Sequence, residues 1–278
     1  MISEKELREE TAVSSIYNET TIADQIHTKW AGKTVHFARE MDSTNLWIKR
    51  LAKEGAPEGT LALAEFQSAG RGRLGRSWEV PEGTSVMMSI LLRPKFEPQY
   101  APTLTLVMGM AVAKAVKNLG FDVSIKWPND VVVSHKKICG ILTEMGVRDG
   151  KIDYAVIGVG INVNIKGFPE EMADKATSLY LEAGREFDRS QIPGLVMEAF
   201  EGYYEKFAAT CDLSGLKDEY ESILANYNQP VRVLAKEPYE GIARGITDGG
   251  ELLVEKEDGT IAVVSAGEVS VRGLYSYV

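Results

Sequence analysis

The stretch that decides the fold is Gln67-Ser68-Ala69-Gly70-Arg71-Gly72-Arg73-Leu74-Gly75-Arg76-Ser77-Trp78. It joins two apolar segments, Leu61–Phe66 and Ser85–Leu92, and each of them predicts a buried strand. Glycine lets a backbone approach a ligand closely, and arginine offers forked donors to carboxylate or phosphate. The loop therefore predicts an anion site, although a loop of this composition also fits a solvated surface segment.

The glycines of this loop match the dinucleotide fingerprint Gly-x-Gly-x-x-Gly at Gly70, Gly72 and Gly75. A Rossmann site needs a helix that begins inside this motif, so that its N-terminus faces the pyrophosphate. Here the chain continues with Pro81 and Gly83 and then enters a strand. The pattern therefore argues against a Rossmann-type oxidoreductase and favours strands joined by a binding loop.

The remaining pattern predicts an α+β catalytic domain with a mixed sheet over residues 31–228, after an N-terminal extension at 1–30. Helices are expected from Ser43 or Thr44 to Gly55, and over 101–119, 190–209 and 213–226. Further strands are expected at Val123–Lys126, Val131–Val133, Ile138–Met145 and Tyr154–Asn164. From 229 to 278, five short alternating runs separated by turns predict a small β-barrel: Val231–Leu234, Ile242–Thr247, Leu252–Glu255, Ile261–Val264 and Val269–Arg272.

Composition excludes several function classes. With 31 basic and 40 acidic residues the net charge is −9, which argues against general nucleic-acid binding because that rests on phosphate neutralisation. No uncharged run is long enough to span a membrane, and the start of the chain is acidic, unlike a signal peptide, so a cytoplasmic protein is expected. Two cysteines and three histidines form neither a disulfide framework nor a recognisable metal motif.

Three further motifs carry polar groups next to predicted strands. Asp130, in Lys126-Trp127-Pro128-Asn129-Asp130, could hold Mg²⁺ or simply make turn hydrogen bonds. Lys137 begins a strand, where its ammonium could face an anion or be an ordinary edge charge. In the strand run around Asn162, glycines at 158 and 160 indicate either a close approach or a bulge.

In this order, the motifs resemble those of the biotin protein ligases, from about Val35 to Arg272. The resemblance implies an SH2-like catalytic domain with an SH3-like C-terminal barrel. It implies formation of biotinyl-5′-AMP from biotin and ATP with Mg²⁺, and transfer of biotin to a lysine of a carboxylase's biotin carboxyl carrier domain. No tightly bound prosthetic group is implied. Residues 1–30 do not resemble the DNA-binding domain of bifunctional members, so no nucleic-acid partner is expected, whereas a homodimer is allowed.

The same resemblance implies the roles of individual residues. Lys137, Arg73 and Arg71 would be catalytic, and Asp130 would bind Mg²⁺. Biotin would be bound by Ser43, Thr44, Asn45, Gln67, Gly70, Arg71, Gly72, Arg73 and Lys137. ATP would be bound by Arg73, Arg76, Trp78, Lys126, Asn129, Asn162 and Arg272. Glu268 and Arg272 would tie the barrel to the active site.

Two rival functions use the same features. A lipoate or octanoate ligase, or a lipoyl-octanoyl transferase, would share the fold. The glycine- and arginine-rich loop at residues 67–78, called the Gly-Arg loop below, and the 126–130 motif fit the biotin branch better. A binding module could hold biotin or its adenylate without transferring it. An intact Lys137 and the complete Gly-Arg loop argue against such a module.

Overall fold

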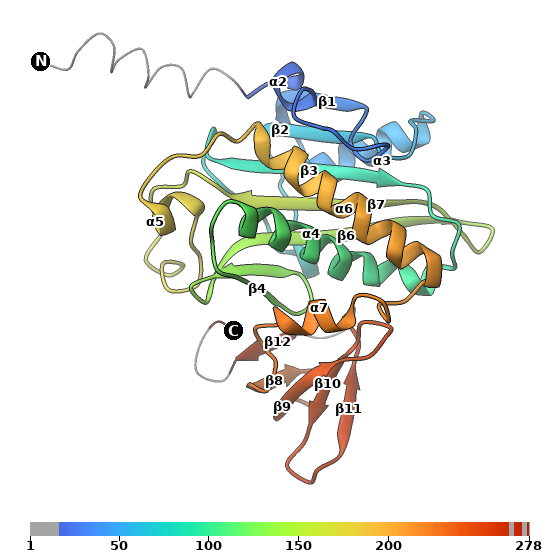
Figure 1. Ribbon diagram of the computed structural model, residues 1–278, viewed down its shortest axis with the longest axis vertical. Coiled ribbons are helices and arrows are strands. Elements are labelled where there is room, and N and C mark those ends of the chain that lie inside the picture. The colour runs from blue at the N-terminus through green and yellow to red at the C-terminus, as the bar shows by residue number, and fades with distance from the viewer. Residues whose placement is uncertain (1–16, 267–269, 274–276, 278) are drawn as a thin grey trace, which may run out of the picture.

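The larger of two sheets forms the frame of the molecule (Figure 1). The computed structural model describes residues 17–266, 270–273 and 277. In spatial order the seven strands are β1 (Val35–Met41), β2 (Leu61–Gln67), β3 (Ser85–Leu92), β7 (Lys151–Asn162), β6 (Lys136–Arg148), β5 (Asp130–Val133) and β4 (Val123–Lys126). β1 and β2 are parallel and the other neighbours are antiparallel, which confirms the predicted mixed sheet.

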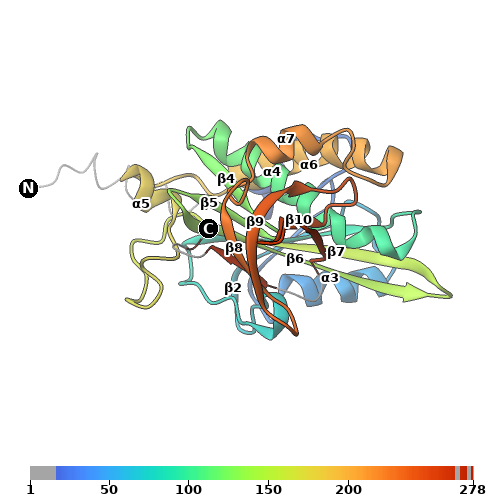
Figure 2. The ribbon, with the colours of Figure 1, turned by 90° about the horizontal axis from the view of Figure 1, so that it is seen from below.

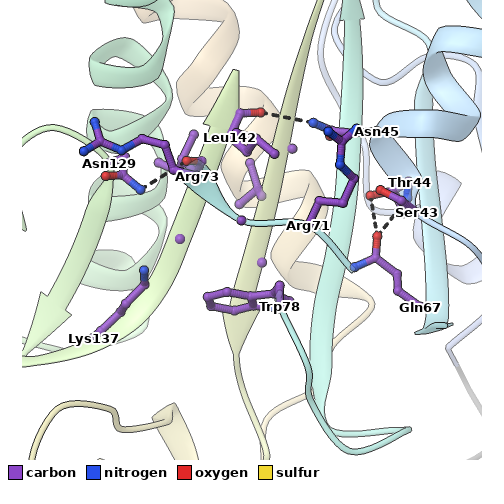
Figure 3. Close-up of a pocket in the computed structure, with 16 residues that line it drawn as sticks. Ser43, Thr44, Asn45, Gln67, Arg71, Arg73, Trp78, Asn129, Lys137 and Leu142 are labelled. Atoms are coloured by element: carbon purple, nitrogen blue, oxygen red, sulfur yellow. Dashed lines mark hydrogen bonds between the residues drawn. The ribbon is translucent and has the colours of Figure 1, made fainter. Parts of the chain in front are cut away.

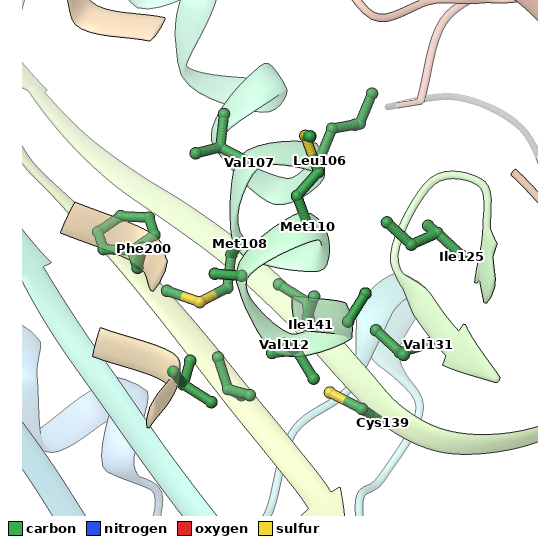
Figure 4. Close-up of a cluster of buried hydrophobic side chains, with 14 of the residues drawn as sticks. Leu106, Val107, Met108, Met110, Val112, Ile125, Val131, Cys139, Ile141 and Phe200 are labelled. Carbon is green, nitrogen blue, oxygen red and sulfur yellow. The ribbon is translucent and has the colours of Figure 1, made fainter. Parts of the chain in front are cut away.

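Helices cover the two faces of this sheet unequally (Figure 2). α4 (Leu104–Asn118) and α6 (Gln191–Thr210) lie on one face, where side chains of β3, β6 and β7 pack under them to form the main core (Figure 4). Cys139 is fully buried in this core, so its thiol serves packing. The shorter α3 (Thr44–Lys53) lies on the opposite face and covers only part of it. The uncovered part of that face is where a binding site can form.

The N-terminal boundary of the large unit differs from the predicted one. Within residues 17–30, Ile22 of α2 (Glu19–Ala23) and Ile26 are buried in the main core. Main-chain N–H groups of residues 29–31 also donate to the Glu201 carboxylate at 2.8–3.1 Å. The unit therefore begins before residue 31, and β1, which the sequence pattern did not reveal, is one of the two edge strands of the seven-stranded sheet.

The predicted helix over 213–226 is wrong in length. The structure forms only α7 (Lys217–Ser222), because the next residues bond to β4 instead of continuing the helix. Ile125 N–H donates to Ile223 O at 2.7 Å, and Ala225 N–H donates to Ile125 O at 2.9 Å. The remaining short elements are η1 (Arg73–Gly75), η2 (Pro98–Thr103) and α5 (Leu179–Ala183).

The small C-terminal unit has the five antiparallel strands that its turn spacing predicts, and they form one sheet, whereas its closure into a barrel stays a prediction. Its spatial order is β11 (Ile261–Val264), β10 (Leu252–Glu255), β9 (Tyr239–Ile246), β8 (Pro230–Leu234) and β12 (Ser270–Gly273). Trp127 Nε1 donates to Gly250 O, and Thr103 Oγ1 donates to Gly249 O, each at 2.9 Å. These bonds seat the small unit on the large one. Among the helices that the structure describes, none has the length and apolar character needed to cross a bilayer.

Candidate active site

A pocket opens on the face of the large sheet that α3 leaves uncovered, beneath the Gly-Arg loop (Figure 3). Its floor is formed by neighbouring positions of β6 and β7, because Gly140 pairs with Gly160 and Leu142 pairs with Gly158. Paired positions of antiparallel strands present their side chains on the same face. Glycine at three of these four positions leaves room for other side chains to lie directly on the backbone.

The strand glycines are needed for close approach rather than for a bulge. A Cβ at Gly158 would collide with the amide oxygen of Asn45. A Cβ at Gly160 would lie 2.6 Å from Trp78 Cε2, and one at Gly140 would lie 2.9 Å from Trp78 Cζ3. The interpretation of these glycines as positions of close approach is thereby confirmed. The groups that approach the pocket floor are the side chains of Asn45 and Trp78.

Neutral polar groups line one end of the pocket, where α3 begins. Thr44 donates through its main-chain N–H and its hydroxyl to Gln67 Oε1, at 2.8 and 3.2 Å. Ser89 Oγ lies 2.7 Å from Thr44 Oγ1 and 2.6 Å from Asn45 Oδ1. Thr44, Asn45 and Ser89 are all buried, as is the N-cap residue Ser43. Such a bonded network holds each side chain in one orientation, since a buried polar group without a partner is costly.

Glu144 supplies a carboxylate that the sequence motifs did not single out. Its Oε2 accepts a 2.9 Å bond from Asn45 Nδ2, and its Oε1 lies 2.7 Å from Lys49 Nζ and 3.4 Å from Arg71 Nη1. Burial by itself would raise the pKa of Glu144, but the bonds from Lys49 and Asn45 outweigh it and hold the pKa below its ordinary value. Strand alternation from Gly140 through Leu142 places Glu144 on the pocket face, and this was the signal available in the sequence.

The arginines of the loop point to different places. The loop folds back on itself, because Gly72 N–H donates to Arg76 O at 2.7 Å and Trp78 N–H donates to Gly70 O at 3.0 Å. Arg71 extends toward Glu144, whereas Arg73 donates from Nη1 to Ala266 O of the small unit at 2.5 Å. Burial lowers the pKa of Arg73, and the nearby carboxylate of Asp130 opposes that shift. Arg76 is exposed and lies outside the pocket.

Lys137 and Asp130 form an ion pair at the other end of the pocket. The Lys137 ammonium lies 2.5 Å from Asp130 Oδ1, and Asn129 Nδ2 donates to the same oxygen at 3.1 Å. Asp130 Oδ2 accepts a 2.6 Å bond from the hydroxyl of Tyr277. Both carboxylate oxygens are therefore engaged by side chains of this protein. Across the described part of the chain, no cluster of three or more His, Cys, Asp or Glu side chains could hold a metal, and the Mg²⁺ assignment stays a prediction.

The structure brings most of the predicted site residues together. Those that line the pocket are Ser43, Thr44, Asn45, Gln67, Arg71, Gly72, Arg73, Trp78, Asn129 and Lys137. Those that do not line it are Gly70, Arg76, Lys126, Asp130 and Asn162. The side chain of Arg272 and the whole of Glu268 lie outside the described residues.

Three buried polar atoms near the Trp78 ring have no hydrogen-bond partner among the residues that the structure describes: Trp78 Nε1, Asn162 Oδ1 and Ser85 Oγ. Ser85 and Asn162 pair across β3 and β7, one step along the strands from Gly160. The cost of leaving buried polar atoms unpaired is high, so such atoms mark places where a polar ligand edge can bind. Asn162 is thus next to the pocket, although it is not part of its lining.

Comparison with known proteins identifies the family. Residues 37–162 match the biotin/lipoate A/B protein ligase family, and residues 227–272 match the biotin protein ligase C terminal domain. The chain is 36% identical over 253 residues to the bifunctional ligase/repressor BirA of Bacillus subtilis, which covers 90% of this chain and 78% of that relative. It is 30% identical over 259 residues to the biotin–[acetyl-CoA-carboxylase] ligase of Mycobacterium tuberculosis, covering 91% of this chain and 94% of that one.

A solved structure agrees with these relatives. The biotin protein ligase of Aquifex aeolicus, in complex with biotin and ATP, superposes with a TM-score of 0.75 at 32% identity and covers 87% of this chain and 99% of its own. Sequence similarity over both units and the fold thus lead to the same assignment. The chain belongs to the biotin protein ligase family.

Proposed function

We propose that this protein activates biotin with ATP and transfers it to a lysine of a biotin carboxyl carrier domain. In the first step a carboxylate oxygen of biotin attacks the α-phosphorus of ATP, the bond to the β-phosphate oxygen breaks, and pyrophosphate leaves. In the second step the neutral ε-amine of the carrier lysine attacks the acyl carbon of biotinyl-5′-AMP. AMP then leaves, and the amine gives up a proton.

One observation carries this proposal: one end of the pocket is lined mainly by neutral polar side chains, with Arg71 beside them, and the other end carries Arg73 and Lys137 (Figure 3). Thr44, Asn45 and Gln67 offer donors and acceptors suited to the uncharged ureido ring of biotin. Arg73 and Lys137 lie toward the other end, where a carboxylate and an α-phosphate would meet (Figure 3). Fixed cations aimed at developing negative charge are the main requirement of such a phosphoryl transfer.

We expect the Gly-Arg loop to move during the cycle. The cavity beneath it has a volume of about 50 Å³, because Trp78 lies on the glycine floor. That space holds only a few water molecules, so substrates enter when residues 70–78 lift. Closure of the loop over biotinyl-5′-AMP would then keep water from the mixed anhydride. Adenine would lie beside Trp78, with its polar edge toward Asn162, whereas Arg76 and Lys126 would act on the outer phosphates.

The function is tested in two stages. The protein is incubated with ATP, Mg²⁺ and either biotin or lipoate, and pyrophosphate release is followed. We expect release with biotin and background release with lipoate; the reverse result would assign the chain to the lipoate branch. A biotin carboxyl carrier domain is then added and its mass measured, and adenylation without any mass increase would identify a binding module that lacks transfer.

A further inference from the structure

Tyr277, which follows β12 of the small unit, reaches across to the large unit and contacts both ends of the 126–130 turn. Its hydroxyl donates to Asp130 Oδ2 at 2.6 Å, and its ring centroid lies 3.5 Å from Lys126 Nζ. We infer that Tyr277 is a positioning residue for Lys137, acting through the carboxylate of Asp130. This inference rests on the proposed role of Lys137 in adenylation.

The carboxylate of Asp130 connects Lys137 to Tyr277, because each of its two oxygens contacts one of these residues. Oδ1 holds the Lys137 ammonium at 2.5 Å and also accepts a 3.1 Å bond from Asn129 Nδ2, whereas Oδ2 accepts the bond from the Tyr277 hydroxyl. A carboxylate held at one oxygen can still turn about its Cβ–Cγ bond, whereas bonds at both oxygens stop that rotation. The lysine side chain has four rotatable bonds and a flexible stem, so the position of its ammonium depends on the partner that holds it. The Asp130 and Lys137 side chains are only 14% and 23% exposed, so water competes weakly for these bonds.

The ring of Tyr277 makes a second, separable contact. Lys126 is 6% exposed, and its ammonium lies over the ring in the geometry of a cation–π pair. Lys126 and Asp130 are paired across the β4–β5 hairpin. Tyr277 thus contacts both residues that flank the turn. Its ring contacts Lys126 and its hydroxyl contacts Asp130.

The same turn is held by the small unit at another point, since Trp127 Nε1 donates to Gly250 O at 2.9 Å. Two parts of the small unit that are 27 residues apart in sequence therefore fix the segment from which Asp130 emerges. The alignment of Lys137 consequently depends on the small unit, although Lys137 itself belongs to the large sheet.

The test separates the hydroxyl from the ring. In the full chain, Tyr277→Phe keeps the ring over Lys126 and removes the donor to Asp130, whereas Tyr277→Ala removes both contacts. We expect Tyr277→Phe to lower kcat for biotin-dependent pyrophosphate release about fivefold or more, the scale of one hydrogen bond to a charged group. KM for biotin should change less than kcat, because the polar side chains proposed to hold the ureido ring are untouched. Tyr227→Phe, at an exposed tyrosine outside the pocket, is the matched control.

A double-mutant cycle then asks whether Tyr277 acts through Asp130. Contacting residues that act in series show non-additive effects, so Tyr277→Phe should cost little further rate in an Asp130→Asn background. Additive losses would overturn the inference, as would a Tyr277→Phe variant with unchanged kcat, whatever Tyr277→Ala does. Thermal unfolding of each variant identifies loss of fold. If the unmodified protein releases no pyrophosphate with biotin, the proposed function fails, and that outcome is distinct from failure of the Tyr277 role.

Discussion

The indole ring of Trp78 rests on the backbone of Gly160, so closely that a Cβ at residue 160 would lie 2.6 Å from Trp78 Cε2. The two residues are 82 positions apart in sequence, and the contact joins the end of the Gly-Arg loop to the middle of the pocket floor. The ring can keep this place only while residue 160 has no side chain. The position of the Trp78 ring therefore depends on glycine at residue 160 of β7.

Gly160→Ala should displace Trp78 without unfolding the protein. The backbone at Gly160 is ordinary strand, so alanine is tolerated there, but the methyl group occupies the place of the ring. We expect pyrophosphate release at fixed, subsaturating biotin and ATP to fall more than about tenfold, a loss above about 1.4 kcal/mol in transition-state stabilisation.

The control for this substitution is Gly202→Ala on α6, where no atom of residues 17–266, 270–273 or 277 lies within 4 Å of the added methyl group. That variant should keep full activity and gain up to about 1 kcal/mol of stability, because alanine is the better helix former. Unchanged activity in Gly160→Ala would contradict the importance of the ring's position.

Lys137→Ala should abolish most adenylation while leaving the fold intact. Removal of its ammonium takes away a cation aimed at the reacting carboxylate and phosphate, and a loss above about tenfold is expected. The adjacent Lys136 is the matched control, because its ammonium donates to Ala173 O at 2.9 Å outside the pocket. Biotin-dependent exchange of pyrophosphate into ATP measures the step, and normal exchange in Lys137→Ala would refute the assignment.

Arg73→Ala should weaken retention of biotinyl-5′-AMP more than its formation. Arg73 joins the loop to the small unit through Ala266 O, so its loss frees the closed loop. We expect faster release of the intermediate, measured as labelled biotinyl-5′-AMP passing a rapid filtration step. The fold should remain, as judged by thermal unfolding. Retention as tight as that of the unmodified protein would show that other contacts hold the loop closed.

Glu144 should make stability depend on pH in a defined direction. Its pKa in the folded protein lies below the ordinary value of 4.5. Its ionised form therefore contributes stability that is complete above pH 4.5 and is lost as the pH falls through the folded-state pKa. Denaturant unfolding of Glu144→Gln should show the largest deficit near neutral pH and a shrinking deficit below pH 4.5.

The exposed turn residue Glu257 provides the comparison for that experiment, since Glu257→Gln removes a carboxylate outside the pocket. Its unfolding free energy should follow that of the unmodified protein at every pH. A deficit in Glu144→Gln that does not change with pH would mean that the side chain contributes through packing alone.

Much of the fold could be predicted because its signals are local. Apolar runs, capping residues and turns predicted every strand of the small unit and most of those in the large sheet. The errors have physical causes: residues 223–226 leave a helical pattern to bond to Ile125, and β1 carries exposed residues typical of an edge. The pocket lining was largely predicted by motif resemblance. Glu144 and Ser89 were not singled out, because their importance depends on bonds to Asn45 that only the folded chain shows.

The sequence by itself determined which chemical groups are present and on which strands and loops they lie, because backbone geometry and apolar periodicity act over a few residues. Only the tertiary structure decided which groups meet. Asn45 forms a hydrogen bond with Glu144, 99 positions away in sequence, and Asp130 forms one with Tyr277, 147 positions away. Such contacts depend on how the strands pair and how the small unit is seated. They are set by packing of the whole core, which no local pattern encodes.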